Sequence, residues 1–161
     1  MDFDSYWEWR NKSSMLELNF LFTTFSKEHY PIYQSWFSDA VLQKALGKLD
    51  KEWLNYVLTD KSGTEWAVFE KNQLIAVIGV THPIQTHNYY VISNIAINPT
   101  LKRQGLGSKI LQLLLQQMPL KKGQHWVSYV EPDNTIAQQF FIKNNWINKG
   151  IVDGMFQYEQ R

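Results

Sequence analysis

Residues 91–118 read VISNIAINPTLKRQGLGSKILQLLLQQM and combine a strand, a basic loop and a helix. Residues 89–97 are rich in β-branched and aromatic side chains, which predicts the strand. Apolar residues recur at helical spacing over residues 106–118, which predicts the helix. The loop between them carries cations and glycines, namely Lys102, Arg103, Gly105 and Gly107. Because glycine lets backbone N–H groups approach an anion, and because the first amides of a helix lack intrahelical partners, this stretch predicts an anion-binding site.

Two better-known phosphate loops do not fit this spacing. A Walker A loop requires lysine and then serine or threonine after its last glycine, but Ser108 precedes Lys109 here, and no glycine stands five residues before Gly107. A dinucleotide-binding G-x-G-x-x-G loop would require glycine at position 110, which is Ile110, and it would follow the strand at once. Both classes therefore lack residues that their chemistry requires.

The loop does match the signature Q/R-x-x-G-x-G/A from Lys102 to Gly107, with lysine where glutamine or arginine is usual. On this motif, and on the Asn98-Pro99 pair after the strand, the segment resembles the GNAT superfamily of acyl-CoA-dependent N-acetyltransferases. The competing interpretation of the motif alone is an ordinary strand-to-helix turn that happens to contain glycines.

A second block, VEPDNTIAQQFFIKNNW at residues 130–146, resembles the family pattern V-x-x-x-N-x-x-A-x-x-F/L-Y-x-K-x-G-F. The matching positions are Val130, Asn134, Ala137, Phe140 and Lys143. Phe141, Asn145 and Trp146 replace the usual tyrosine, glycine and phenylalanine. Two blocks in the family's order are more specific than either alone, and the resemblance covers about residues 15–160.

The rest of the chain predicts further elements around this centre. Strands are expected at residues 15–22, 65–70, 74–81 and 126–130, with a terminal hairpin of residues 147–152 and 155–160. Helices are expected at residues 26–36, 39–46, 50–58 and 134–144, the first three capped by Ser26, Asp39 and Asp50. The resemblance implies a GNAT-like α/β fold: a mixed, mostly antiparallel sheet flanked by helices, with one parallel splayed strand pair. Because no linker divides the sequence, residues 1–161 are predicted to form a single GNAT acetyltransferase domain with residues 1–14 as a lead-in segment.

Composition excludes several classes of function. The chain has no cysteine, which removes disulfides and thiolate nucleophiles, and its four histidines lack metal-ligand spacing, so no metal is expected. The basic and aromatic residues do not interleave as in nucleic-acid-binding proteins, and no apolar run is long enough to span a membrane. With no signal-peptide pattern at the start, a cytoplasmic protein is expected.

Charge is divided unevenly along the chain. Residues 1–70 contain 7 Lys/Arg and 11 Asp/Glu, whereas residues 71–161 contain 9 and 4. This division would suit a polyanionic cofactor on the C-terminal half and a cationic acceptor on the N-terminal half, although a chance distribution of solvated charges explains it as well.

The resemblance implies that acetyl-CoA is the acyl donor and that it enters where the two parallel strands separate. Its pantetheine arm would pair with the backbone of the central strand, and its pyrophosphate would bind the loop amides. The implied donor-binding residues are Ile95, Ala96, Ile97, Lys102, Arg103, Gln104, Gly105, Leu106, Gly107, Ser108, Asn134, Phe141 and Lys143.

The implied acceptor is a primary amine of a small molecule or a peptide, which must lose a proton before it attacks the thioester. Family members often place a carboxylate on the central strand for this step, and the matching position here is Ser93, which is no base but could hold a water. Since Phe141 stands where a tyrosine usually protonates the leaving thiolate, Tyr129 on the neighbouring strand is the candidate substitute. Packing is the competing role for both side chains.

The sequence leaves some alternatives open. Residues 36–49 and the hairpin at Asp153-Gly154 are expected to wall the acceptor site, with Asp39, Asp50, Glu131 and Asp153 available to attract a cation. A homodimer is compatible with this interpretation. The main rival function is a non-catalytic acyl-CoA-binding or regulatory protein, because Ser93 and Phe141 replace catalytic residue types. A plain nucleotide-binding module is a third possible function.

Overall fold

The computed structural model describes residues 20–101 and 105–161. Within these residues a seven-stranded sheet has the order β1-β2-β3-β4-β5-β7-β6. Its strands are β1 (Phe20–Thr24), β2 (Gly63–Glu70), β3 (Gln73–Thr81), β4 (Tyr89–Ile97), β5 (His125–Val130), β6 (Ile147–Val152) and β7 (Met155–Gln160). Neighbouring strands are antiparallel except β4 and β5, which are parallel. The predicted mixed α/β sheet is therefore confirmed.

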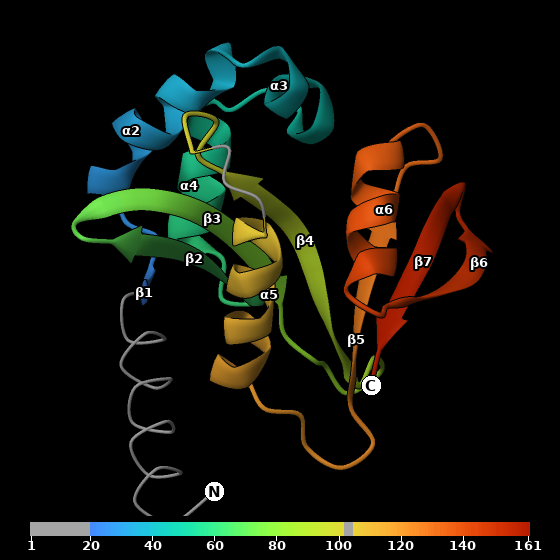
Figure 1. Ribbon diagram of the computed structural model, residues 1–161. Helices are drawn as coiled ribbons and strands as arrows, with labels where there is room; N and C mark the ends of the chain where they lie inside the picture. The colour runs from blue at the N-terminus through green and yellow to red at the C-terminus, as the bar shows by residue number, and fades with distance from the viewer. Residues whose placement is uncertain (1–19, 102–104) are drawn as a thin grey trace, which may run out of the picture.

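Helices cover the sheet from both sides (Figure 1). On one face lie α2 (Tyr30–Ser35), α3 (Ala40–Leu46) and α4 (Lys51–Thr59), with short 3-10 turns η1 (Lys27–His29) and η2 (Trp36–Ser38). On the other lie α5 (Leu106–Gln117) and α6 (Thr135–Lys143). None of the helices in the described part of the chain has the length and apolar character needed to cross a bilayer.

Two predicted helix caps are confirmed by their hydrogen bonds. Asp39 Oδ1 accepts from the backbone N–H of Leu42 at 3.0 Å and begins α3. Asp50 Oδ1 accepts from the N–H of Trp53 at 3.0 Å and begins α4. Each carboxylate satisfies a donor that the first helical turn leaves free.

The N-terminal elements differ in detail from the sequence prediction. The helix expected over residues 26–36 consists of η1 followed by α2, since Pro31 lies in the first turn of α2 and favours a helix start. The first described strand covers Phe20–Thr24 rather than residues 15–22. The earlier part of that predicted strand, and the lead-in segment, lie outside the described residues.

Strand β3 separates two cores, and all of its residues from 74 to 80 are buried. One core joins β3 to α5 and α6 through Ile78, Leu114 and Phe141. The other joins β3 to the N-terminal helices through an aromatic layer around Tyr33, whose ring centroid lies 5.1–5.7 Å from those of its neighbours. Alternate residues of the same strands therefore fix helices on opposite faces.

Replacing Leu114 with Ala should lower the free energy of unfolding by about 2 to 5 kcal/mol, because the side chain is 0% exposed and its removal leaves a cavity in the α5 core. Urea unfolding at constant pH measures this change. The control is Leu58→Ala on α4, where the side chain is 46% exposed and a loss below about 1 kcal/mol is expected. Equal losses for the two variants would contradict the described core.

Candidate functional site

The parallel ladder between β4 and β5 is short. It runs from Tyr89 opposite His125 to Ile92 opposite Ser128, although β4 continues to Ile97. At its last rung the buried Ser128 hydroxyl donates to the carbonyl of Ile92 at 3.1 Å. Beyond this rung the strands separate (Figure 1), so the backbone of β4 that faces β5 has no strand partner on that side among the described residues.

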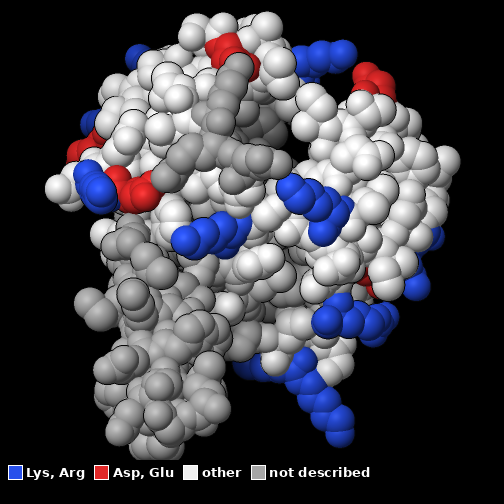
Figure 2. All heavy atoms as spheres, viewed as in Figure 1, with Lys and Arg blue, Asp and Glu red and all other residues white. Residues whose placement is uncertain are grey.

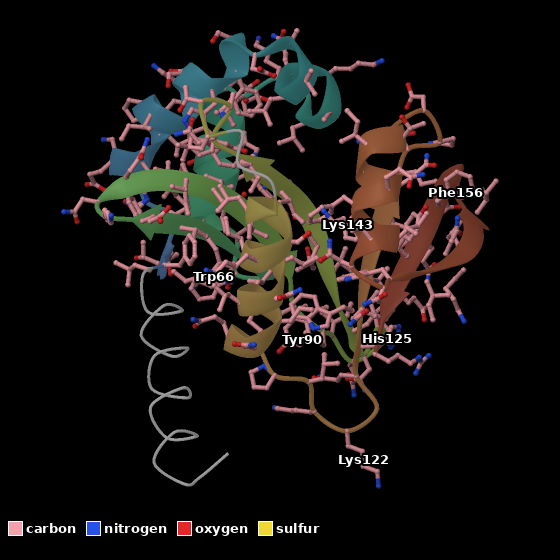
Figure 3. The ribbon with its side chains drawn as sticks, viewed as in Figure 1. Trp66, Tyr90, Lys122, His125, Lys143 and Phe156 are labelled. Carbon is pink, nitrogen blue, oxygen red and sulfur yellow. The ribbon has the colours of Figure 1, made fainter. Side chains whose placement is uncertain are left out.

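Aromatic contacts hold the paired end of the two strands together. The rings of Tyr90 and Trp126 stack with centroids 4.7 Å apart, and those of Tyr89 and His125 lie 5.2 Å apart. Figure 3 shows Tyr90 and His125 at this end of the sheet, whereas Lys143 lies further along, beside the separated strands. The pair is closed at one end and open at the other.

A β-bulge in β4 lies where the ladder stops. Gly79 of β3 is opposite Asn94, and Val80 is opposite Ile92, so Ser93 is the extra residue. The bulge interrupts the alternation of side chains between the two faces of the sheet, so the side chains of Ser93 and Asn94 lie close together. Ser93 Oγ donates to Asn94 Oδ1 at 3.2 Å. Polar side chains therefore lie together at the point where β4 and β5 begin to separate.

Glu65 of β2 completes this polar group. Register places Glu65 opposite Gly79 and Gly79 opposite Asn94, so the three residues form one row across β2, β3 and β4. Asn94 Nδ2 donates to Glu65 Oε1 at 2.8 Å across the glycine between them. A Cβ at position 79 would collide with Asn94 Oδ1 and lie 2.5 Å from Ser93 Oγ and 2.6 Å from Glu65 Oε2. Only glycine leaves room for this contact.

Burial raises the pKa of Glu65 to about 7, and the hydrogen bond from Asn94 opposes this shift only in part. The carboxyl therefore changes between its protonated and ionised forms near neutral pH. A carboxyl with such a pKa, at the edge of a pocket, has the properties of a general base. The sequence prediction did not identify Glu65.

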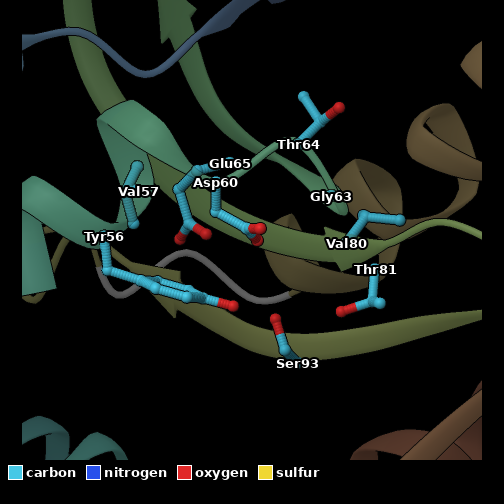
Figure 4. A pocket seen from close by; sticks show the side chains of 9 residues that line it. All are labelled: Tyr56, Val57, Asp60, Gly63, Thr64, Glu65, Val80, Thr81 and Ser93. Atoms are coloured by element: carbon cyan, nitrogen blue, oxygen red, sulfur yellow. The ribbon is translucent and has the colours of Figure 1, made fainter.

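Glu65 and Ser93 share a pocket of about 130 Å³ on the face of the sheet that carries α4 (Figure 4). Its lining residues are Tyr56, Val57, Asp60, Gly63, Thr64, Glu65, Val80, Thr81 and Ser93. The side chains of Tyr56, Asp60, Glu65, Thr81 and Ser93 direct their oxygen atoms toward the same space (Figure 4). The predicted position Ser93 thus lies beside a carboxylate that a different strand supplies.

None of the residues predicted to wall the acceptor site lines this pocket. Residues of α4 and of the α4–β2 turn line it, whereas Trp36, from the expected wall of residues 36–49, is buried in the aromatic layer. Asp39 and Asp50, expected as cation-attracting groups, use their carboxylates as helix caps. Glu131 and Asp153 lie exposed in turns at the other end of the sheet order.

The N-terminus of α5 is the candidate anion-binding end of the site. Gly105 precedes the helix in the left-handed conformation with φ 81°, and it has no side chain to cap the first amides. Among the described residues no heavy atom beyond its chain neighbours lies within 4 Å of where its Cβ would be. The first amides of α5 and this open space suit an anion. Lys102, Arg103 and Gln104, also predicted here, lie outside the described residues.

Gly107 and Ser108 have packing roles in the first turn of α5. A Cβ at Gly107 would lie 3.2 Å from the ring of Phe140, so the glycine lets α5 and α6 approach closely. The Ser108 hydroxyl accepts from Asn144 Nδ2 at 3.0 Å and ties the two helices together. Leu106 points into the core.

The other predicted donor-binding residues lie along β4 and α6. Ile95 and Ile97 pack toward the α5 core, whereas Ala96 packs toward the aromatic layer. Asn134 Oδ1 accepts from the N–H of Ala137 at 3.1 Å and caps α6. Lys143 is exposed in the last turn of that helix. Figure 2 views the face with α5 and α6. It shows a hollow in the surface between the part of the molecule with strands β1 to β4 and the part with β5, β6 and β7.

Phe141 and Tyr129 occupy different environments. Phe141 is 5% exposed and stacks on Tyr158 with ring centroids 5.7 Å apart, so its role in the described structure is packing. Tyr129 follows the last rung of the β4–β5 ladder. Partial burial and a hydrogen bond with Tyr89 raise the pKa of Tyr129 to about 12, so its hydroxyl stays protonated at neutral pH.

Comparison with known proteins agrees with this geometry. The model of the GNAT acetyltransferase family matches residues 19–145. No curated protein matches the sequence. Because the family model spans most of the sequence, the chain belongs to the GNAT acetyltransferase family, as its two sequence blocks predicted.

Solved structures show the same fold at low sequence identity. An acetyltransferase from Thermus thermophilus is 13% identical with a TM-score of 0.74, over 88% of this chain and 96% of that one. PaiA N-acetyltransferase from Thermoplasma acidophilum, solved in complex with coenzyme A, is 15% identical with a TM-score of 0.65, over 88% and 98%. The ribosomal-protein-S18-alanine N-acetyltransferase from Escherichia coli is 14% identical with a TM-score of 0.61, over 87% and 90%.

Replacing Glu65 with Gln should stabilise the protein at pH 8 and leave its stability nearly unchanged at pH 4. The unfolded chain ionises this carboxyl near its ordinary pKa of 4.5, whereas the folded protein ionises it at about 7. The folded state therefore holds an extra proton between these values, and its stability falls as pH rises through that range. Removing the ionisable group should raise the free energy of unfolding by about 1 to 3 kcal/mol at pH 8.

Urea unfolding of both proteins at the two pH values measures this difference. Glu52→Gln, which removes an exposed carboxylate from α4, is the matched control and should show no such pH dependence. An equal effect of Glu65→Gln at pH 4 and pH 8 would show that the carboxyl has an ordinary pKa.

Proposed function

We propose that this GNAT protein is an N-acetyltransferase that moves an acetyl group from acetyl-CoA to a primary amine by direct attack in a ternary complex. The observation that carries the proposal is the row of Glu65, Gly79 and Asn94, which holds a carboxyl with a pKa of about 7 beside the opening between β4 and β5. In this proposal the row would bring a proton acceptor to the place where the donor's thioester lies.

The donor would use the open end of the strand pair and the start of α5. The first amides of α5, next to Gly105, would bind the diphosphate, and Lys143 offers a further positive charge from α6. The unpaired backbone of Ile95 to Ile97 offers amide and carbonyl groups to the pantetheine arm, as an added strand would use them. The coenzyme A complex of the similar PaiA enzyme supports this choice of donor.

Glu65 would remove the proton that blocks attack. An alkyl ammonium with a pKa of about 10.4 must lose this proton, at a cost of about 4 to 5 kcal/mol at pH 7. This first proton passes to Glu65 directly or through a water bound to Ser93, which shares the pocket. The amine nitrogen then bonds to the thioester carbonyl carbon, the carbon–sulfur bond breaks, and coenzyme A leaves as its thiolate, while the nitrogen releases its second proton to solvent.

Asn94 and Gly79 are positioning residues in this scheme. Asn94 fixes one carboxylate oxygen of Glu65 through its amide, so the other oxygen is left for the pocket. Gly79 leaves the space that this arrangement needs.

The leaving group needs less assistance than the amine. A thiol with a pKa near 8.5 leaves as a thiolate at neutral pH, so Phe141 in place of tyrosine would lower the rate without abolishing it. Tyr129 keeps its proton and lies just past the last rung, which makes it the proposed donor of a hydrogen bond to the sulfur.

The replacement at Phe141 also favours a second function, a non-catalytic acyl-CoA-binding or regulatory protein, because this side chain is fully committed to packing. Both functions require coenzyme A binding, and turnover distinguishes them.

A single domain over residues 1–161, cytoplasmic location and a homodimeric state remain predictions from the sequence.

Replacing Glu65 with Gln should lower kcat/KM for amine acetylation at pH 7 by about 10² to 10⁴-fold, because a general base contributes an effect of this size. Release of free thiol from acetyl-CoA in the presence of an amine panel measures the rate. The affinity for coenzyme A, measured by calorimetry, should stay unchanged because Glu65 lies away from the α5 N-terminus.

Glu52→Gln on α4 is the charge-matched control and should retain wild-type rates. Coenzyme A binding without thiol release from any amine in the wild-type protein would favour the non-catalytic function. Full activity of the Glu65→Gln variant would remove Glu65 from the mechanism.

A further inference from the structure

The pocket beside Glu65 contains a second carboxylate. Asp60 lies in the turn between α4 and β2, and its oxygens accept from the Ser62 backbone N–H at 3.1 Å and from the Ser62 hydroxyl at 2.7 Å. The Tyr56 hydroxyl also hydrogen bonds to Asp60. These neutral donors, led by the Ser62 hydroxyl, lower the pKa of Asp60 and keep it ionised at neutral pH.

Neither carboxylate has a cationic partner in the described part of the chain. No ion pair joins Asp60 or Glu65 to a described lysine, arginine or histidine, and none of these residue types lines the pocket. The lining instead offers hydroxyl groups from Tyr56, Thr81 and Ser93. The pocket therefore presents acceptor oxygens and uncompensated negative charge to whatever enters it.

Tyr56 adds an aromatic surface at the mouth of the pocket. Its side chain is 60% exposed, and its hydroxyl is directed toward Asp60 (Figure 4). An aromatic face next to a carboxylate attracts an alkyl ammonium both through the ring and through the charge. Val57 provides an apolar wall between this rim and Glu65.

From this arrangement we infer that the acceptor is an alkyl amine that carries a second positive charge, of the diamine class. The reacting nitrogen lies at Glu65 and Ser93, and the distal ammonium binds Asp60 and Tyr56 while the carbon chain contacts Val57. This inference rests on the proposed function and specifies its substrate.

The two carboxylates have different tasks in such a complex. Glu65 is held by Asn94 at the β4 bulge, next to the reacting centre, whereas Asp60 lies at the rim, where solvent reaches it. A second positive charge on the acceptor offsets the repulsion between the two anions, and a monoamine leaves Asp60 without a partner. Asp60 is therefore a specificity-determining residue and takes no part in proton transfer.

The test compares acetylation of α,ω-diaminoalkanes with that of monoamines of the same chain length. In the wild-type protein the KM for the best diamine should be about 3- to 10-fold lower than for its monoamine, the range expected for a partly exposed charge pair. Asp60→Asn keeps a hydrogen-bond acceptor for Ser62 and removes the charge. This variant should raise the diamine KM by the same factor, leave kcat unchanged and leave the monoamine KM unchanged.

Two further measurements make the outcome decisive. Added salt should raise the diamine KM more than the monoamine KM in the wild type, and this difference should vanish in Asp60→Asn. Glu52→Gln, an exposed charge on the same helix that does not line the pocket, should alter neither KM.

The inference is overturned if diamines and monoamines have equal KM values, if peptides without a second cationic group are the best acceptors, or if Asp60→Asn affects both amine classes alike. The absence of thiol release with every amine would instead contradict the proposed function, so the two failures are distinguishable.

Discussion

The site depends on one interruption of hydrogen bonding, the end of the parallel ladder between β4 and β5 after Ile92 and Ser128. Stacked rings close the pair at one end, and the bulge at Ser93 coincides with its opening at the other. A fully paired strand would leave no free backbone for a ligand within the sheet. The interruption therefore gives up a few ladder hydrogen bonds and leaves free backbone groups for the proposed binding site in the middle of the fold.

The same bulge connects the two halves of the chemistry. The proposed donor side, with α5 and α6, lies on one face of the sheet, and the pocket with α4 lies on the other. Because the row from Glu65 through Gly79 to Asn94 crosses three strands, the proposed base is held by sheet register rather than by a loop. Rigid placement of this kind suits a group that must meet a reacting atom at a fixed distance.

Sequence patterns predicted most of the fold because local signals agreed with it. Asp39 and Asp50 precede helical periodicity, and both cap helices in the structure. The glycine loop correctly marked the start of α5. These features depend on neighbours a few residues apart, so a single sequence contains them.

The carboxyl of the site was missed because its neighbours are far apart in sequence. Glu65 and Asn94 are separated by 29 positions and meet only through the pairing of β2, β3 and β4. A signal was present, since Glu65 alternates with Ala67 and Phe69 on a strand face that packs against helices, where an acidic residue is unusual. Ser93, which the sequence analysis named, lines the pocket, but the bulge that turns Asn94 toward Glu65 has no sequence pattern of its own.

The most direct test of this account is a crystal structure of the protein with coenzyme A. The account predicts the diphosphate at the first amides of α5 and the pantetheine arm hydrogen bonded to the β4 backbone between Ser93 and Ile97, with its sulfur near the pocket of Glu65. A ligand bound elsewhere, or β4 and β5 paired along their whole length in the complex, would contradict it.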